Sequence, residues 1–310
     1  MSRILLYFLA IFFLAQSVFA APPTEPLRLS LMPVPDSFPA YVAEEKGFFK
    51  AEGVEVKLLP VGSAIEREQL MQAGHIDGMI NEIMSAASLN RERIRVKVIS
   101  IARAPLGDSP GFRLLVGKNS PITTMKDLAG VPIAVGRNTV IEYVTARMLS
   151  SLPKDAIVYQ SVPVVPERMQ LLMSGQVRAA VLPDQMGVAA MAAGAREIVN
   201  DLTIAQLSAS AITFSVAALE GKTAAVQAFM RAWDKACAEI NANPEALRPL
   251  FLQKIRLPKN IAKTYPIPPM PRHVVPSQKQ WDDAMAWMKD VKLLENPPSY
   301  QDSVTDAFLP

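Results

Sequence analysis

A chain of 310 residues, half of them hydrophobic, is long enough to fold as one large or two medium-sized α/β domains. The formal net charge of +3 is small and evenly spread, which argues against a nucleic-acid or anionic-membrane partner. The only cysteine, Cys237, cannot form an internal disulfide, and it lies on the apolar face of a predicted helix. We therefore expect a buried thiol and a fold held by packing alone.

The first twenty residues have the three parts of a secretory signal peptide. Arg3 supplies a positive charge, residues 4–14 form an apolar run, and Val18-Phe19-Ala20 offers a cleavage site. The apolar run is shorter than the ~20 residues that a spanning helix needs, and no cysteine stands at the cleavage point to carry a lipid anchor. The sequence predicts cleavage after Ala20 and a soluble mature protein.

Short strands and helices alternate in the first part of the mature chain. Alternating leucines over residues 27–31 are typical of a strand, as is the apolar alternation over 54–60. Between these two strands, a loop with Pro33 and Pro35 leads into a helix over 38–46 that Gly47 ends. Residues 95–102 and 112–118 are predicted as further extended segments.

The second part of the chain repeats this alternation. A turn and a short helix over residues 120–130 precede a strand over 131–136, a helix over 141–151 and a strand over 157–162. Residues 214–219 are predicted as a strand that leads back to the first unit. About three helices, one of which contains Cys237, complete the chain.

Two stretches about a hundred residues apart carry the same pattern. Residues 66–81 read EREQLMQAGHIDGMIN and residues 167–182 read ERMQLLMSGQVRAAVL. In each, an amphipathic helix ends at a glycine, Gly74 or Gly175, that suits the left-handed position after a helix. A short apolar segment follows and suits a buried strand. The repeat predicts two similar α/β units, with lobe 1 over residues 27–117, lobe 2 over 118–212, a return of 213–310 to lobe 1, and two strands crossing between lobes.

Motifs along nearly the whole mature chain together resemble one family. They are GFFKAEGVEVKLLPVGS, AGHIDGMI, KDLAGVPIAVGRNT, NPEAL, WMKD and the terminal Phe-Leu-Pro. These motifs resemble the solute-binding proteins of ABC importers for nitrate, sulfonates, taurine and thiamine precursors. The resemblance implies an α/β, two-lobed periplasmic-binding-protein fold of type II, in which each lobe is a mostly parallel sheet flanked by helices. It also implies a periplasmic monomer that binds a small-molecule ligand between its lobes, has no cofactor, and works with an ABC permease and its ATPase.

Two departures from the family pattern leave the substrate open. The first loop reads MPVPDSFP instead of a glycine-rich, aromatic sequence, and Leu182 stands where many members have an acidic residue.

Polar residues follow the predicted strands at the places where open α/β sheets bind ligands. We take these residues as candidate ligand-binding residues, with ordinary helix capping or a solvated loop as the alternative for each. They are Asp36, Ser37 and Phe38 after the first strand, Gly62 and Ser63 after the second, Asn81 and Glu82 after the third, Arg137, Asn138 and Thr139 in the second unit, and Asp184 and Gln185 after its repeat strand.

The charge of the ligand has two interpretations. Predicted helix N-termini at Ser63 and Asn138 favour an anion. The carboxylates of Asp36, Glu82 and Asp184 instead favour a cation, an amine or an aminopyrimidine. The number of acidic residues tilts the prediction towards a nitrogen-bearing organic molecule.

Motifs for catalysis are sparse. With only His75 and His273, the chain has no HExxH motif, and the GxSxG, Walker A and GxGxxG motifs are also missing from the sequence. Gly107-Asp108-Ser109 resembles the nucleophile block of GDS esterases but lacks a recognisable Asp-x-x-His partner. We therefore expect a binding protein without enzymatic activity or a metal, and the alternative is a secreted sensor or enzyme domain on the same two lobes.

Overall fold

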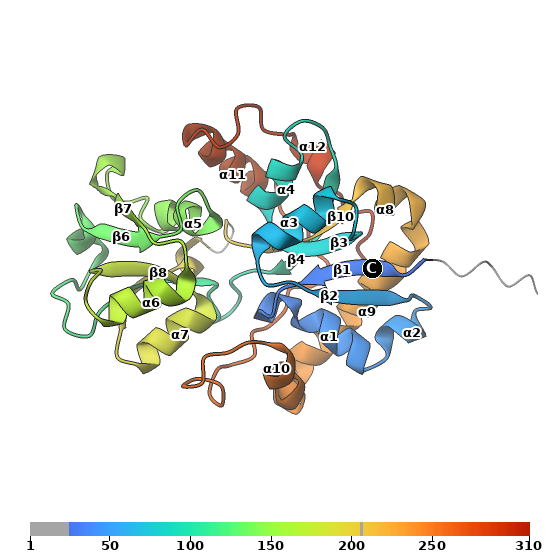
Figure 1. Cartoon of the computed structure of the whole chain (residues 1–310), viewed down its shortest axis with the longest axis horizontal. Helices are drawn as coiled ribbons and strands as arrows, with labels where there is room; N and C mark the ends of the chain where they lie inside the picture. Colours follow the sequence, from blue (N-terminus) through green and yellow to red (C-terminus); the bar gives the residue numbers. More distant parts are fainter. Residues whose placement is uncertain (1–24, 205–206) are drawn as a thin grey trace, which may run out of the picture.

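The computed structural model describes residues 25–204 and 207–310, so the predicted signal peptide lies outside the described residues. The chain forms two lobes side by side, each built around a five-stranded sheet (Figure 1). In sheet order, lobe 1 contains β2 (Val56–Pro60), β1 (Leu27–Leu31), β3 (Gly78–Glu82), β10 (Ser210–Ser215) and β4 (Val96–Arg103). Lobe 2 contains β7 (Val158–Ser161), β6 (Pro132–Val135), β8 (Ala179–Pro183), β5 (Phe112–Val116) and β9 (Arg196–Asn200).

The two sheets have the same topology. One strand of each, β10 in lobe 1 and β5 in lobe 2, runs antiparallel to both of its neighbours, whereas the pairs β1–β2, β1–β3, β6–β7 and β6–β8 are parallel. Each antiparallel strand is the one that enters its lobe from the other lobe. This arrangement confirms the predicted two-lobed α/β fold with mostly parallel sheets.

Helices cover both faces of each sheet. One face of lobe 1 packs on α1 (Phe38–Glu45), α2 (Phe48–Ala51), α8 (Val216–Gly221), α9 (Thr223–Ala242) and α10 (Arg248–Lys254). The other face packs on α3 (Ala64–Gln72), α4 (Ile83–Leu89), α11 (Gln278–Asp290) and α12 (Tyr300–Ser303). Lobe 2 has α5 (Val140–Met148) on one face and α6 (Val165–Met173) with α7 (Asp184–Ala192) on the other. No helix within the described ranges is both long and apolar enough to cross a bilayer.

The sequence repeat marks equivalent elements of the two lobes. Helix α3 with β3 and helix α6 with β8 are related by the same offset, and Gly74 and Gly175 have φ angles of 70° and 76°, as predicted for the left-handed position. The repeated arginine makes the same hydrogen bond in both lobes. Arg67 Nη1 donates to Ile80 O at 2.9 Å, and Arg168 Nη1 donates to Val181 O at 2.8 Å. In both lobes a buried guanidinium therefore ties the helix to the strand that follows it.

Three details of the predicted organisation are wrong. Residues 112–116 were expected in lobe 1, but they form β5 of lobe 2, because the position beside β8 is filled by the strand that enters from lobe 1. The strand predicted over 214–219 ends at Ser215, whose Oγ accepts a hydrogen bond from Ala218 N and so caps α8. The segments that cross between lobes, 104–111 and 201–209, are not strands in their described residues, and the second begins with the 3-10 helix Asp201–Ile204.

A buried group of charges joins the lobes beside these crossing segments. The carboxylate of Asp184, at the start of α7, accepts from Arg103 Nη2 of lobe 1 and from Arg113 Nε of lobe 2, both at 3.1 Å. Tyr265, from the segment after α10, donates its hydroxyl to the same carboxylate at 2.6 Å. Only 3 % of Asp184 is exposed, so its charge depends on these partners.

The surroundings determine the protonation states of Arg103 and Tyr265 in this group. Burial by itself lowers the pKa of the Arg103 guanidinium, but the charges of Asp36 and Asp184 outweigh it and raise that pKa. Burial, followed by the charge of Asp184, raises the pKa of the Tyr265 hydroxyl well above its usual value. At neutral pH Arg103 is therefore charged and Tyr265 is a neutral donor.

The C-terminal part of the chain also contacts both lobes. Asn260 Nδ2 donates to Ala189 O of α7 at 3.0 Å. On the opposite side of the molecule, α11 packs on α4 of lobe 1, and its Asp283 accepts from Tyr143 Oη and Arg147 Nε of α5 at 2.8 and 2.6 Å. The predicted return of the chain to lobe 1 thus includes two connections to lobe 2.

We predict that Asp184→Asn lowers the free energy of unfolding by about 3 to 5 kcal/mol, because the neutral amide leaves two arginines without their shared counter-charge. Chemical denaturation followed by circular dichroism measures this loss. The matched control is Glu92→Gln, which removes an exposed carboxylate paired with Arg95 and should change stability by less than ~1 kcal/mol. Equal stabilities of the two variants would contradict a structural role for the Asp184 carboxylate.

Candidate functional site

A cleft of about 490 Å³ lies between the lobes, at the carboxyl ends of the strands. Its walls come from three parts of the chain: lobe 1, lobe 2 and the C-terminal segment. Most of its lining is apolar, including Met32, Val34, Ile80, Phe112, Ile141, Val165 and Met186. A small number of polar groups set in an apolar lining is typical of a site for a small organic molecule.

Asn81, which lines the cleft on lobe 1, is held by a chain of hydrogen-bonded side chains. Asn81, only 1 % exposed, accepts from Thr213 Oγ1 at 2.6 Å and donates to Ser85 Oγ at 3.2 Å. Ser85 Oγ in turn donates to Glu68 Oε1 at 2.6 Å. These bonds fix the Asn81 amide at the end of β3, so it lines the cleft in one orientation.

Arg67 also lines the cleft on lobe 1. Its guanidinium contacts Glu82 Oε2 at 2.9 Å and Glu68 Oε1 at 3.4 Å, and its side chain is 2 % exposed. The Nε atom of Arg67 is buried without a hydrogen-bond partner among the described residues, as are the Oγ atoms of Ser37 and Ser210. All three residues line the cleft. Because a buried polar atom without a partner costs free energy, these atoms indicate where a polar ligand gains most.

Helix N-termini from both lobes meet at the cleft. Gly62 and Ala64 line it at the start of α3, Val140 and Ile141 at the start of α5, and Val165 at the start of α6. The first N–H groups of a helix have no partner within the helix and carry partial positive charge. With the orphaned Arg67 Nε nearby, these helix ends favour an oxyanion over a cation.

The three carboxylates that suggested a cationic ligand are already paired. Asp36 lies 3.5 Å from Arg103, Glu82 pairs with Arg67, and Asp184 is shared by Arg103 and Arg113. A carboxylate that already neutralises an arginine attracts a second cation weakly. The count of acidic residues in the sequence therefore does not support a nitrogen-bearing ligand.

The structure separates the twelve candidate residues into two groups. Half of them line the cleft, and for these a ligand contact stays a prediction: Asp36, Ser37, Gly62, Asn81, Glu82 and Gln185. The others have different surroundings. Phe38 is fully buried against Phe251, Ser63 and Thr139 accept the N–H groups of Glu66 and Ile141 as helix caps, and Asp184 lies in the buried charge group. Arg137 pairs with Glu142 and lies over the Tyr159 ring, and Asn138 N donates to Glu142 Oε2.

Sequence reasoning missed three arginines of the cleft, Arg67, Arg103 and Arg256. Arg103 is the last residue of β4, so the rule that ligands bind at strand ends could have found it. Arg67 stands in the repeat, where its match with Arg168 was visible. Arg256 follows α10, far along the chain from the strand ends, and no local pattern marks it.

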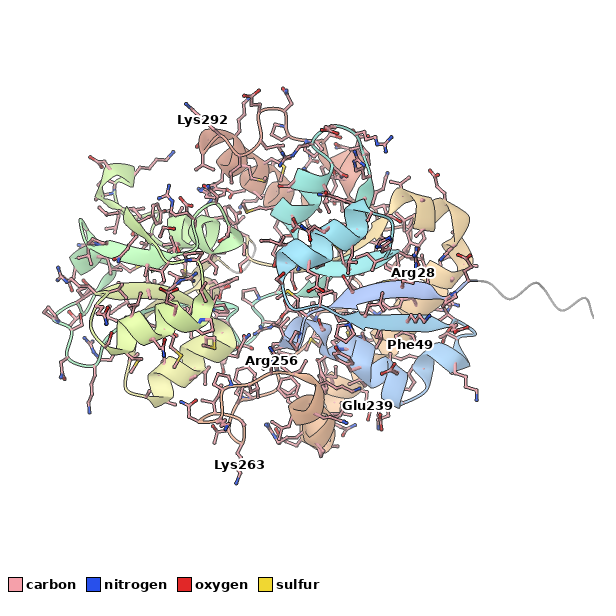
Figure 2. The ribbon with its side chains drawn as sticks, in the orientation of Figure 1. Arg28, Phe49, Glu239, Arg256, Lys263 and Lys292 are labelled. Carbon is pink, nitrogen blue, oxygen red and sulfur yellow. The ribbon has the colours of Figure 1, made fainter. Side chains whose placement is uncertain are left out.

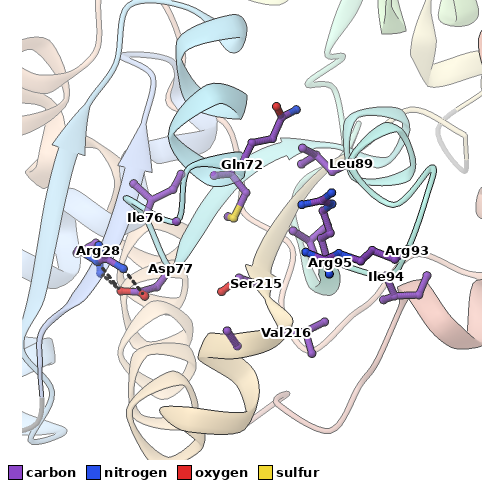
Figure 3. Close-up of a pocket in the computed structure, with 14 residues that line it drawn as sticks. Arg28, Gln72, Ile76, Asp77, Leu89, Arg93, Ile94, Arg95, Ser215 and Val216 are labelled. Atoms are coloured by element: carbon purple, nitrogen blue, oxygen red, sulfur yellow. Dashed lines mark hydrogen bonds and ion pairs between the residues drawn. The ribbon is translucent and has the colours of Figure 1, made fainter.

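A second cavity, of about 380 Å³, lies at the amino ends of β1, β3 and β4 in lobe 1 (Figure 3). Its buried carboxylate, Asp77, accepts hydrogen bonds from Arg28 and Lys222. Burial raises the pKa of Asp77, but these bonds outweigh it and lower that pKa, so the group is satisfied as a structural ion pair. Among the residues that the structure describes, none from lobe 2 lines this cavity, whereas residues of both lobes line the interlobe cleft.

Histidine and cysteine are absent from the described lining of the cleft. Neither histidine lines it, and Cys237 is buried in the core of lobe 1, where burial raises the pKa of its thiol. Within the described ranges, no group of three or more His, Cys, Asp or Glu side chains is arranged to hold a metal ion.

Solved structures with this fold cover nearly the whole chain. The periplasmic aliphatic sulphonate binding protein SsuA from Escherichia coli has a TM-score of 0.77 at 17 % identity and covers 92 % of each chain. The alkanesulfonate-binding protein SsuA from Xanthomonas axonopodis pv. citri, bound to MOPS, has a TM-score of 0.73 at 16 % identity over 92 % of this chain and 99 % of the other. The desulfurization enzyme DSZB has a TM-score of 0.66 at 17 % identity over 91 % of this chain and 97 % of the other.

These identities are low, so the neighbours establish the periplasmic-binding fold and nothing finer. A comparison with curated protein sequences found no significant match. A family model described as NMT1/THI5 like matches residues 34–247, which span most of both lobes and the start of the C-terminal helices. The chain belongs to the NMT1/THI5 like family.

Proposed function

We propose that the chain is the solute-binding component of an ABC importer, which captures a small organic oxyanion between its lobes and delivers it to a permease and its ATPase. The observation that carries this proposal is the interlobe cleft. Three residues of its largely apolar lining, Ser37, Ser210 and Arg67, each have a buried polar atom without a partner among the described residues. A solute with a polar head and an apolar body satisfies both features at once.

The proposed charge of the solute rests on the pairing of the acidic residues and on the helix ends. Asp36 and Glu82 are neutralised by arginines, and the starts of α3, α5 and α6 line the cleft. The proteins with the same fold include two that bind aliphatic sulphonates or alkanesulfonates, one of them holding MOPS. All of these features favour a solute with a sulfonate or carboxylate head group.

The route to the permease belongs to the same proposal. Residues 1–20 carry the pattern of a signal peptide, and export would place the mature chain in the periplasm as a monomer. The two lobes meet through irregular segments rather than a continuous sheet, which suits hinge closure around a solute.

An enzyme on the same lobes is the alternative, because DSZB has this fold. In this chain the only thiol is buried in the lobe 1 core, and neither histidine lines the cleft. Asp108 and Ser109 lie in the crossing segment 104–111, where Ser109 forms a backbone bridge with Leu106. The cleft thus holds groups that bind and orient a solute, and these favour the binding function.

The proposal predicts that organic oxyanions stabilise the mature protein. A thermal-shift screen should compare alkanesulfonates, carboxylates and nitrate with amines and aminopyrimidines at equal concentration. A ligand at 100 times its dissociation constant raises the free energy of unfolding by about 2.7 kcal/mol, which gives a clear rise in melting temperature. Stabilisation by amines or aminopyrimidines alone would contradict the oxyanion assignment, and no stabilisation by any class would contradict solute binding.

Glu82→Gln tests the sign of the ligand's charge. Removing this carboxylate should tighten binding of an oxyanion about fivefold, since two charges ~8 Å apart interact by roughly 1 kcal/mol at an effective dielectric constant of about 40. Isothermal titration calorimetry with the best oxyanion from the screen measures the change. The exposed Glu92→Gln variant loses the same charge far from the cleft and serves as the control. Weaker binding by Glu82→Gln alone would show that Glu82 accepts a hydrogen bond from the ligand.

A further inference from the structure

Arg256 lies between the two lobes on the segment that follows α10 (Figure 2). Two contacts, one of the preceding residue and one of its own backbone, fix the position of Arg256. Ile255, only 3 % exposed, is anchored in the lobe 1 core, and Arg256 N donates to Pro33 O at 3.0 Å. Pro33 belongs to the loop after β1 and also lines the cleft. The backbone of Arg256 is therefore fixed at the rim of the site while its side chain is exposed.

Arg256 differs from the other arginines of the cleft in its pairing. Arg67 and Arg103 each contact carboxylates within 3.5 Å. The Arg256 guanidinium has no ion pair and no side-chain hydrogen bond among residues 25–204 and 207–310. It is thus the cleft-lining charge that the described part of the chain leaves uncompensated.

A purely structural role does not explain why the Arg256 side chain is unpaired at the cleft. An exposed arginine away from any site usually does no more than interact with water. Arg256 instead lines a cavity whose lobe 2 side includes the apolar residues Val165, Pro166 and Met186. An unpaired guanidinium in the lining of a cleft that also has an apolar wall is suited to hold the anionic head of a solute whose body packs on that wall.

We propose that Arg256 anchors the oxyanion head of the solute and makes the C-terminal segment a third wall of the binding site. This proposal rests on the proposed solute-binding function and adds the residue that recognises the charge. The planar guanidinium can give two parallel hydrogen bonds to a sulfonate or a carboxylate, which a lysine cannot reproduce.

The location also links binding to the arrangement of the lobes. The segment that carries Arg256 continues to Asn260, which donates to Ala189 O of lobe 2, and to Tyr265, which donates to Asp184. A solute held by Arg256 is therefore attached to a segment that contacts both lobes. Binding at this residue should favour the closed arrangement in which those contacts form.

The test uses three probes that share an unbranched alkyl body and differ in the head group: 1-hexanesulfonate, hexanoate and hexylammonium. Each probe is titrated calorimetrically into the mature protein. Arg256→Gln should weaken binding of both oxyanions at least about tenfold, as expected for a lost charge-assisted hydrogen bond. Arg256→Lys should retain part of the affinity, because the charge remains without the paired donors. Lys259→Gln is the control, since it removes an exposed charge of the same segment outside the cleft. It should change binding less than about twofold.

Each outcome separates the role of Arg256 from the proposed function. If the parent protein binds the oxyanions and folded Arg256→Gln binds them equally well, Arg256 is not the anchor, while solute binding stands. If the parent binds hexylammonium but neither oxyanion, the oxyanion assignment fails and the role of Arg256 fails with it. If the parent binds none of the three probes, both proposals are contradicted. Circular dichroism and melting temperature establish that each variant is folded.

Discussion

The relative position of the lobes depends on the carboxylate of Asp184. It is the first residue of α7 in lobe 2, and it is bound by Arg103 at the end of the last parallel strand of lobe 1. Arg113, at the far end of the crossing segment, binds its other oxygen, and Asp184 N donates to Gly111 O at 2.8 Å. A buried ion pair is stable only when every charge in it is matched. This buried charge and its partners thus form one of the connections that hold the two lobes in register.

The second crossing segment is tied to the first at the same place. Gly111 N donates to Asp201 Oδ1 at 2.8 Å, and Ser208 Oγ donates to Asp201 Oδ2 at 2.6 Å. Burial raises the pKa of Asp201, against the effect of these hydrogen bonds. Both crossing segments therefore converge on polar groups beneath the cleft. Hinge motion in such a molecule has to take place around this polar junction, in the short stretches of irregular backbone on either side of it.

The repeated arginine shows how duplicated elements take different roles. Arg67 and Arg168 both bind the carbonyl of the following strand, but Arg67 also pairs with Glu82, and the residue equivalent to Glu82 in lobe 2 is Pro183. The other nitrogens of Arg168 donate to the carbonyls of Val162 and Pro163, and burial lowers its pKa to about 10. Lobe 2 thus keeps the structural half of the pattern, and lobe 1 adds a charged pair at the cleft.

Elements with a local cause could be predicted from the amino-acid pattern. Alternating leucines predicted β1, and the glycines at 74 and 175 predicted two helix ends, because backbone preference and side-chain periodicity act within a few residues. The repeat, together with the family resemblance, predicted two lobes with mostly parallel sheets. Of the candidate residues that the strand-end rule proposed, half line the cleft.

Three features become visible only when the chain is folded: the lobe that contains β5, the carboxylates that arginines neutralise, and the cleft arginine that has no ion pair among the described residues. Strand β5 follows lobe 1 in sequence but completes the sheet of lobe 2. Asp184 was a candidate ligand-binding residue in the sequence, and the fold instead brings Arg103, Arg113 and Tyr265 around its carboxylate. Arg256 becomes a cleft residue through its bond to Pro33. The physical reason is common to all three: electrostatic pairing and burial depend on distance in space, and the partners lie too far apart along the chain for any local pattern to join them.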